Sequence, residues 1–376
     1  MSSEHARLLR ESVDDFVARG TDIARVRALR RSAGEYDRAA WQRMADLGWV
    51  GIRVPEAYGG SGLGLADAAI VAEGVGRALM AEPFTAAAVL ASGVLAGSDN
   101  ETLKQNLLPA FARGGLVPAL AWQERSATLD AAHIAATAVP FEGGYRLNGT
   151  KRYVCGAAAA DVFVVAAKTD TELVLACIDR NAPGVTLELE PIADGRHFGT
   201  LRLEDTVASR ERIVATGNAA SAELERALDH ATAIVGAELY GVMSRALEMS
   251  VEYMKTRVQF GRAIGSFQAL QHRAVDLYLQ QQLASAALEQ GLRELDADPA
   301  PTTRSAIASR IKARCSEAGL RITREAIQIH GAIGFTDEYD AGLYLKRALV
   351  LAAWLGNAAQ HRRRYAQLTL RSEAST

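Results

Sequence analysis

Apolar residues recur at helical spacing over the first part of the chain. Residues 4–18 and 36–48 place apolar side chains three and four positions apart, which puts them on one face of a helix. The same spacing predicts further helices at about 65–80, 84–96 and 101–113. Between them, the glycines and the proline of 54–64 predict an irregular connection. We therefore expect an N-terminal helical domain over residues 1–116.

The pattern changes near residue 117 and becomes typical of strands. Short apolar runs follow one another at fairly regular spacing, at 133–139, 144–154, 161–166, 173–178, 185–189 and 199–203. The dipeptide Asn148-Gly149 in the second run is typical of a tight hairpin turn. Many short strands with turn signals indicate a small antiparallel sandwich or barrel. We expect this middle antiparallel β-domain to cover residues 117–217.

From about residue 218 to the end, the spacing is helical again. Long apolar-periodic segments are predicted at 220–257, 268–294, 301–330 and 340–370. Four long helices with short connections are typical of an up-and-down bundle. The fold class predicted for the whole chain is therefore α+β and multidomain, with a C-terminal four-helix bundle over residues 218–376.

Composition is that of an ordinary globular protein, with 376 residues, 49% hydrophobic residues and a net charge of −2. The three cysteines, Cys155, Cys177 and Cys315, form no C-x-x-C pair, and the histidines show no ligand spacing, so we predict no metal site. The N-terminus is charged, and no apolar run approaches the ~18–20 residues that span a membrane. We expect a cytoplasmic protein that contacts neither membrane nor nucleic acid.

Two segments carry candidate chemistry. In 257–272, Arg257 at a helix end is suited to hold a pyrophosphate, and Phe260 is suited to stack on an aromatic ring. In 328–339, Gln328 and Gly331 end a helix where backbone N–H groups can meet phosphate. Each residue alone also has an ordinary structural explanation, as a helix-end charge, a core ring or a cap. The ordered pair of segments within a helical–β–helical frame is more specific.

These segments resemble the acyl-CoA dehydrogenase family, and the resemblance extends along nearly the whole chain. The string R-x-x-F-G-x-x-I-x-x-F-Q at 257–268 is similar to the family's FAD element, and 54–64, 148–154 and 328–339 are similar to three other family segments. The resemblance implies an acyl-CoA substrate, FAD, α,β-desaturation, an electron-transferring flavoprotein as acceptor, and a dimer of dimers. It also implies FAD contacts from Arg257, Gln259, Phe260, Gln268, Gln328, His330, Gly331 and Cys155.

The chain departs from the family where the catalytic carboxylate is expected. Leu355 stands at the usual position of the base, and Ala231 stands at the position that a minority of members use. The flavin-facing segment 123–130 is also altered, and Cys155 replaces a hydroxyl residue. In these respects the chain resembles the small subunits of heteromeric bacterial acyl-CoA dehydrogenases, which lack the catalytic base, such as the pimeloyl-CoA and steroid-catabolic types. We expect a base-lacking subunit of an α2β2 enzyme whose partner subunit carries the catalytic Glu.

Two alternatives remain open. An active homotetramer would need a displaced base, for which the carboxylates are Glu238, two helical turns after Ala231, and also Asp229 and Glu124. A non-enzymatic relative would bind nucleic acid through the basic run 361–365, although the net charge of −2 argues against this and a solvated helix end or an oligomer contact explains the run. The identity of the acyl group is set by cavity shape, which sequence alone does not define.

Overall fold

The computed structural model describes residues 3–20, 23–29, 36–125 and 133–373. The chain divides into two compact units. Unit 1 comprises residues 1–27, 69–80 and 232–376, and unit 2 comprises residues 28–68 and 81–231. Among the helices of the described segments, none has the length and apolar character needed to cross a membrane.

The N-terminal part is helical, as predicted. Its segments are α1 (Ser3–Gly20), α2 (Ile23–Leu29), α3 (Arg38–Asp46), the 3-10 turn η1 (Glu56–Tyr58), α4 (Leu65–Arg77), the π-helix η2 (Phe84–Ala91), α5 (Ser92–Ala96) and α6 (Glu101–Ala112). The side chain of Asp37 accepts from Ala40 N at 2.9 Å and begins α3. Asn100 caps α6 in the same way through Leu103 N at 3.0 Å. The short helix α2 was not predicted from the sequence.

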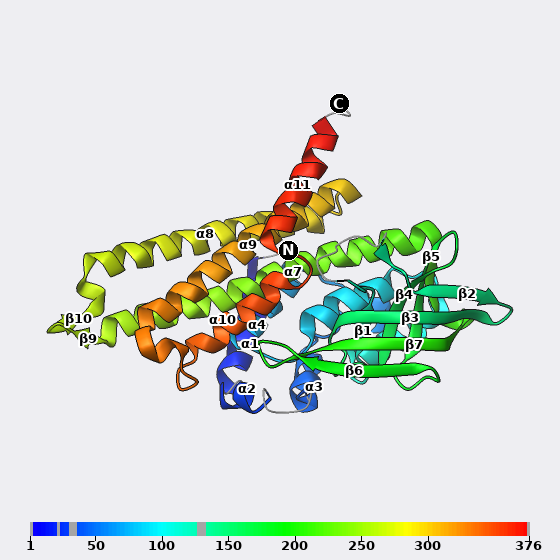
Figure 1. Cartoon of the computed structure of the whole chain (residues 1–376), viewed down its shortest axis with the longest axis horizontal. Helices are drawn as coiled ribbons and strands as arrows, with labels where there is room; N and C mark the ends of the chain where they lie inside the picture. Colours follow the sequence, from blue (N-terminus) through cyan, green and yellow to red (C-terminus); the bar gives the residue numbers. More distant parts are fainter. Residues whose placement is uncertain (1–2, 21–22, 30–35, 126–132, 374–376) are drawn as a thin grey trace. The chain divides into compact units, whose positions relative to one another are not determined.

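The middle of the chain forms one sheet of eight strands (Figure 1). Its strands are β1 (Pro118–Ala121), β2 (Thr137–Phe141), β3 (Gly144–Cys155), β4 (Val162–Lys168), β5 (Leu173–Asp179), β6 (Val185–Pro191), β7 (His197–Ser209) and β8 (Ile213–Thr216), and a 3-10 turn, η4 (Arg210–Arg212), precedes β8. The order is β6-β7-β3-β2-β4-β5-β8, with β1 beside β4. Pairing is antiparallel except at β1–β4 and at one β2–β4 residue pair. The predicted antiparallel β-domain is thereby confirmed.

The turn predicted at Asn148-Gly149 is wrong, because both residues lie inside β3. The hairpin turn between β2 and β3 instead lies at residues 142–143, since Phe141 pairs with Gly144. Asn148 exchanges hydrogen bonds with Asp205 of β7, accepting from its N–H at 2.8 Å. Gly149 sits at a shift of strand register with φ of 139°, where a Cβ would come within 2.8 Å of the Ala136 backbone. The dipeptide marks a bulge rather than a turn.

The C-terminal part is helical, as predicted. Its segments are α7 (Gly217–Thr256), the strands β9 (Val258–Gln259) and β10 (Arg262–Ala263), the turn η5 (Ile264–Ser266), α8 (Gln268–Asp296), α9 (Pro301–His330), the turn η6 (Gly331–Phe335), α10 (Ala341–Ala353) and α11 (Ala358–Glu373). The single helix predicted at 340–370 is two helices, because Leu355 and Gly356 adopt left-handed backbone with φ of 56° and 94°. Figure 1 shows α8 and α9 running side by side.

Candidate functional site

The segment 257–268 folds as a short hairpin after the end of α7. Strands β9 and β10 pair, and Phe260 and Gly261 form the two-residue turn with φ of 53° and 77°. Such a turn needs left-handed backbone, which glycine adopts freely and a bulky side chain adopts only under strain. The Phe260 ring contacts Phe267 edge-on, with centroids 6.1 Å apart, yet remains 92% exposed. A strained and exposed aromatic ring indicates a residue held for a ligand or a partner.

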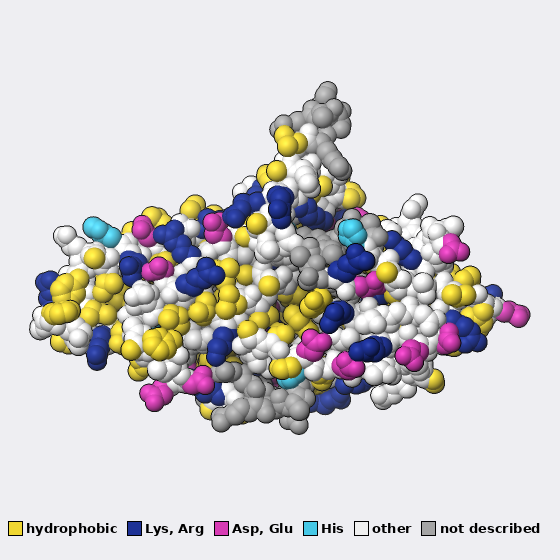
Figure 2. Space-filling model, viewed as in Figure 1, with side chains coloured by type: hydrophobic (Ala, Val, Ile, Leu, Met, Phe, Trp, Pro, Cys, Tyr) yellow, Lys and Arg dark blue, Asp and Glu magenta, His cyan; other side chains and the backbone are white. Residues whose placement is uncertain are grey.

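Polar side chains flank this hairpin and are exposed. Arg257 N donates to Tyr253 O at 2.8 Å, and Arg257 O accepts from Ile264 N at 2.8 Å, so the backbone is held on both sides. No described residue forms a hydrogen bond or ion pair with the exposed Arg257 guanidinium. Gln268 opens α8 and is also exposed. Figure 2 shows hydrophobic side chains at the surface of this end, over β9 and β10.

The end of α9 supplies a second exposed group. Gln328 is exposed in its last turn, and Gly331 follows with φ of 64° and open space where a Cβ would stand. Tyr253, one turn before Arg257, stacks on His330 with centroids 4.5 Å apart. The ends of α7 and α9 therefore lie side by side, and both candidate segments belong to one end of unit 1.

His330 itself is buried, and its hydrogen bonds are internal. Its Nδ1 lies 2.7 Å from Ala326 O, and because a carbonyl only accepts, Nδ1 carries the proton. Its Nε2 then accepts from Tyr339 OH at 3.0 Å. Burial lowers the pKa of His330. The ring is thus a neutral support for the chain reversal at Gly331.

These residues fit the adenosine and pyrophosphate part of FAD. A guanidinium without a described partner and exposed amides from Gln259, Gln268 and Gln328 provide hydrogen-bond donors suited to phosphate and adenine. Gly331 allows a ligand to approach the backbone closely. Phe260 offers a ring face for stacking.

The candidate flavin-side residue Cys155 belongs to unit 2, at the end of β3. Two positions before it, Tyr153 adopts φ of 56° at a shift of register between Lys151 and Val154. Its ring meets Phe198 of β7 edge-on at 6.4 Å. A bulge re-aims the side chains that follow it and is frequent beside active sites. This is the local geometry that presents Cys155.

Glu124 is engaged in the structure of unit 2. Its carboxylate accepts from Ala135 N at 2.7 Å and Ala136 N at 2.9 Å, and it pairs with Lys151 Nζ. Burial acts to raise the pKa of Glu124, but the Lys151 ammonium and the two N–H groups outweigh it and hold this pKa below its usual value. Burial lowers the pKa of Lys151 to about 8. Of the altered segment 123–130, residues 126–130 lie outside the described residues.

The position of the usual base lies in the turn between α10 and α11. Leu355 is buried, and its carbonyl accepts from His361 Nε2 at 2.7 Å. Lys312 of α9 donates to three carbonyls of the same turn, those of Leu351, Ala352 and Gly356. Burial lowers the pKa of Lys312 to about 7. The turn has no carboxylate but is held by a dense set of hydrogen bonds.

The other candidate positions for a base are also occupied by apolar or paired groups. Ala231 is fully buried in α7. Glu238 Oε1 pairs with Arg347 Nη1 at 3.2 Å, and both side chains are only 2% exposed. Arg347 also donates to Met80 O at 2.9 Å and Leu79 O at 3.3 Å. Glu238 therefore has the structural role of a buried ion pair, and Asp229 is buried and engaged as well.

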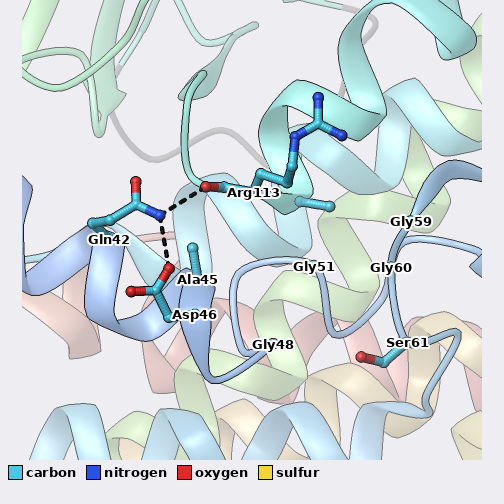
Figure 3. A pocket seen from close by; sticks show the side chains of 10 residues that line it. Gln42, Ala45, Asp46, Gly48, Gly51, Gly59, Gly60, Ser61 and Arg113 are labelled. Carbon is cyan, nitrogen blue, oxygen red and sulfur yellow. Dashed lines mark hydrogen bonds between the residues drawn. The ribbon is translucent and has the colours of Figure 1, made fainter.

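A pocket of about 440 Å3 lies in unit 2 beside the glycine-rich segment 54–64. It is lined by Gln42, Ala45, Asp46, Gly48, Gly51, Gly59, Gly60, Ser61, Ala112 and Arg113 (Figure 3). The Gln42 amide donates to Asp46 Oδ1 at 2.9 Å and to Arg113 O at 3.0 Å. A Cβ on Gly60 would come within 2.2 Å of Val54 O, so close packing explains this glycine. The lining contains no pair of groups suited to proton transfer.

Sequence reasoning missed several buried polar residues, namely Lys151, Lys312, Arg347 and His361. The basic run 361–365 is not a uniformly solvated helix end, because His361 is fully buried and Arg364 donates to Ser305 Oγ at 3.0 Å. A single signal was available: Lys312 interrupts the apolar face of a strongly periodic helix. Across the described residues, no group of three or more His, Cys, Asp or Glu side chains is arranged to hold a metal ion.

Comparison with known proteins agrees with the fold. Models of the acyl-CoA dehydrogenase N-terminal, middle and C-terminal domains match residues 3–115, 119–206 and 222–369. The chain is 33% identical to acyl-CoA dehydrogenase IpdE2 of Mycobacterium tuberculosis over 346 residues, which is 92% of this chain and 91% of that protein.

Two solved structures are similar over the full chain. A variant of the steroid ACAD Tcur3481-Tcur3483 is 29% identical with a TM-score of 0.89, and the match covers 100% of both chains. The ChsE4-ChsE5 complex from Mycobacterium tuberculosis contains a chain that is 27% identical with a TM-score of 0.88, covering 100% of this chain and 99% of that one.

The three family models that match the helical, β and helical parts describe a class of flavin-dependent oxidoreductases that act on CH–CH bonds. The chain belongs to the acyl-CoA dehydrogenase family. FAD is the cofactor of this family, and the predicted cofactor is confirmed at that level.

Proposed function

We propose that this chain is the base-lacking subunit of a hetero-oligomeric acyl-CoA dehydrogenase. It lends the adenosine and pyrophosphate side of an FAD site to a partner subunit, and that partner contributes the catalytic Glu. The single observation that carries the proposal is a contrast. The positions expected for a base are apolar, whereas the residues expected to hold the adenosine and pyrophosphate of FAD (the FAD arm) have the types found in the family and are exposed, namely Arg257, Gln259, Phe260, Gln268 and Gln328.

Loss of the base is supported by the surroundings of both expected positions. Leu355 and Ala231 are buried and apolar, so neither accepts a proton. The carboxylates that would replace them are committed elsewhere, Glu238 to Arg347 and Glu124 to Lys151 and two backbone N–H groups. An active homo-oligomer with a displaced base therefore has less support.

A partner is supported by an apolar stripe on α8. Val275, Tyr278, Leu279 and Leu283 follow helical spacing and are each between 51% and 56% exposed. Contiguous exposed apolar side chains on one helix face are typical of a protein interface. The stripe belongs to the helix that Gln268 opens, so an interface there is continuous with the FAD arm.

The relatives support a heteromeric assembly and a class of substrate. One solved relative is a complex of two different named chains, ChsE4 and ChsE5, and another is a steroid ACAD. For this chain we infer a steroid-derived acyl-CoA as the substrate and an electron-transferring flavoprotein as the electron acceptor. We also place its domain boundaries at residues 116 and 217.

The residues of this chain act in binding and orientation. Arg257 would neutralise pyrophosphate charge, the three glutamines would orient the adenosine, and Phe260 would cover the adenine from water. FAD supplies the hydride-accepting flavin when it is bound. Removal of the α-proton falls to the partner's carboxylate, since a general base must lie within hydrogen-bond reach of that proton.

The test is the flavin content of the chain expressed alone and with a Glu-bearing acyl-CoA dehydrogenase subunit. Flavin is quantified by visible absorption after denaturation, and turnover is measured with steroid-derived and straight-chain acyl-CoA. We expect little flavin and no turnover from the lone chain, and both from the co-expressed pair. About one FAD per chain together with turnover by the lone chain would contradict the proposal.

The interface has a matched test. Leu279→Asp places a charge on the α8 stripe and should reduce co-purification with the partner. Leu370→Asp makes the same change at an exposed leucine of α11 and should leave co-purification unchanged. Equal effects of the two variants would argue against the stripe as the interface.

A further inference from the structure

Three backbone carbonyls at the turn between α10 and α11 accept hydrogen bonds from one side chain. Lys312 Nζ lies 2.9 Å from Leu351 O, 3.1 Å from Ala352 O and 2.8 Å from Gly356 O. It also lies 3.2 Å from Ser316 Oγ. The whole Lys312 side chain is buried, so these groups replace water as its partners.

The turn needs such support for two reasons. The last carbonyls of a helix have no partner within that helix, and Leu351 and Ala352 are in the last turn of α10. Leu355 then adopts φ of 56°, a conformation that is strained for a branched apolar residue and persists only when its surroundings impose it. Lys312 satisfies the carbonyls on both sides of the strained residue.

His361 holds the strained residue itself. Its Nε2 lies 2.7 Å from Leu355 O, and because this carbonyl only accepts, Nε2 carries the proton. Its Nδ1 then accepts from Ser309 Oγ at 3.2 Å. Ser309 and Lys312 are both on α9, so one helix anchors the turn through two side chains.

We propose that Lys312 and His361 are positioning residues that hold the α10–α11 turn in one conformation. The conformation of this turn is then set by hydrogen bonds to its backbone and not by packing of the side chain at position 355. The inference rests on the proposed function only in taking position 355 as the site of the missing base. A consequence is that the scaffold for a base persists in a subunit that has no base.

Hydrogen–deuterium exchange of the purified full chain tests the proposal, because amide exchange reports local opening. In Lys312→Met, peptides covering 351–361 should exchange at least ten-fold faster, while peptides from α8 and the β-domain keep their rates. Lys346→Met changes a partly exposed lysine of α10 and is the matched control. Unchanged exchange at 351–361, or equal acceleration in every peptide, would overturn the proposal.

His361 offers a second test if Lys312→Met does not fold. A glutamine side chain still has an N–H that is able to donate to Leu355 O, whereas leucine has none. Amide exchange at 351–361 should therefore be slowest in wild type, faster in His361→Gln and fastest in His361→Leu. The rate in His361→Leu should be at least ten-fold higher than in wild type. Equal rates for the two variants would contradict a role for the hydrogen bond.

Leu355→Ala completes the test, because it removes the side chain and keeps the backbone contacts. We expect exchange at 351–361 within two-fold of wild type. A ten-fold acceleration would show that side-chain packing defines the turn and would overturn the inference. None of these readouts depends on bound flavin, so a failure of the proposed function, seen in flavin content, is distinguishable from a failure here.

Discussion

Two regions of unit 1 differ in how their polar groups are satisfied. At the hairpin and the end of α9, Arg257 and Gln328 are exposed, and Phe260 projects into solvent. At the α10–α11 turn, Lys312 and His361 are buried and bonded to backbone. The first region is arranged to meet something outside the chain, whereas the second is complete within it.

Under the proposed function, this difference shows how a site shared between two subunits would be divided. Groups that bind a ligand between the subunits would remain without partners in the single chain, so exposure and backbone strain would mark them. Groups that support a reactive residue would be satisfied within the chain and would persist when that residue is lost. Substitutions at the internally bonded α10–α11 turn (the complete region) should therefore change stability. Substitutions at the hairpin and the end of α9 (the exposed region) should change binding alone.

The largest effect is expected for Glu238→Leu. It leaves the Arg347 guanidinium buried without its carboxylate, and breaking such a pair costs about 3–5 kcal/mol of unfolding free energy. Urea unfolding monitored by circular dichroism measures the change. Glu238→Gln keeps a hydrogen-bonding group and should cost less. If Glu238 were instead the catalytic base, Glu238→Gln would abolish turnover without altering stability.

Acid should destabilise the α10–α11 turn through protonation of His361. Burial, followed by the nearby Lys312 charge, lowers the pKa of His361 to about 3. The unfolded chain binds this proton near pH 6.5 and the folded chain does not, so stability is lost as pH falls from about 6.5 toward 3, by at most about 5 kcal/mol. Unfolding free energies measured across this range should show a steeper slope for wild type than for His361→Gln. Equal slopes would argue against this assignment.

In the exposed region, Arg257→Ala should weaken FAD retention by the assembled pair. Loss of a hydrogen bond to a charged group costs about 1.5–3 kcal/mol, roughly a ten- to hundred-fold change in affinity. The lone chain should unfold at an unchanged urea concentration, because no described residue pairs with this guanidinium. Arg293→Ala, at an exposed arginine of α8, is the control. Unchanged FAD retention in Arg257→Ala would remove the residue from the site.

The smallest effect is expected for Phe260→Ala. Aromatic stacking contributes about 0.5–1.5 kcal/mol, so FAD affinity should fall only about two- to ten-fold. Alanine keeps the Cβ, so the left-handed strain at φ of 53° remains, and the stability of the lone chain should be unchanged. Fluorescence titration of the flavin-free pair with FAD measures the first effect. A loss of stability would show that the ring belongs to the core of this chain.

Periodicity predicted most of the fold because helix and strand faces leave a regular signal. The long helices α7, α8 and α9 and the strands β4 to β7 are where the apolar pattern predicts them. Besides the unpredicted helix α2, two errors fall where single residues adopt left-handed backbone, at Gly149 within β3 and at Leu355 and Gly356 between α10 and α11. Such conformations depend on tertiary hydrogen bonds, as from Lys312 and Asp205, which no local pattern contains.

The candidate site was predicted unevenly for a related reason. Arg257, Phe260 and Gln328 belong to short motifs that the family resemblance associates with FAD, so their types and spacing are informative. His330 occupies the same motif but supports the turn from inside, bonded to Ala326 and Tyr339. Lys312 donates to backbone carbonyls more than 30 residues away in sequence, and His361 donates to the carbonyl of the strained Leu355. No short motif in the sequence marks either residue.

In the proposed assembly, the exposed hairpin also has a consequence for chains made in excess of the partner subunit. Proteases with aromatic specificity cut extended, accessible segments, and the Phe260–Gly261 bond lies at the tip of such a segment. Brief chymotrypsin treatment should nick the unassembled chain there and spare the assembled one, provided that the interface covers the tip. In a cell, the same exposure would tie the lifetime of this polypeptide to the supply of its partner.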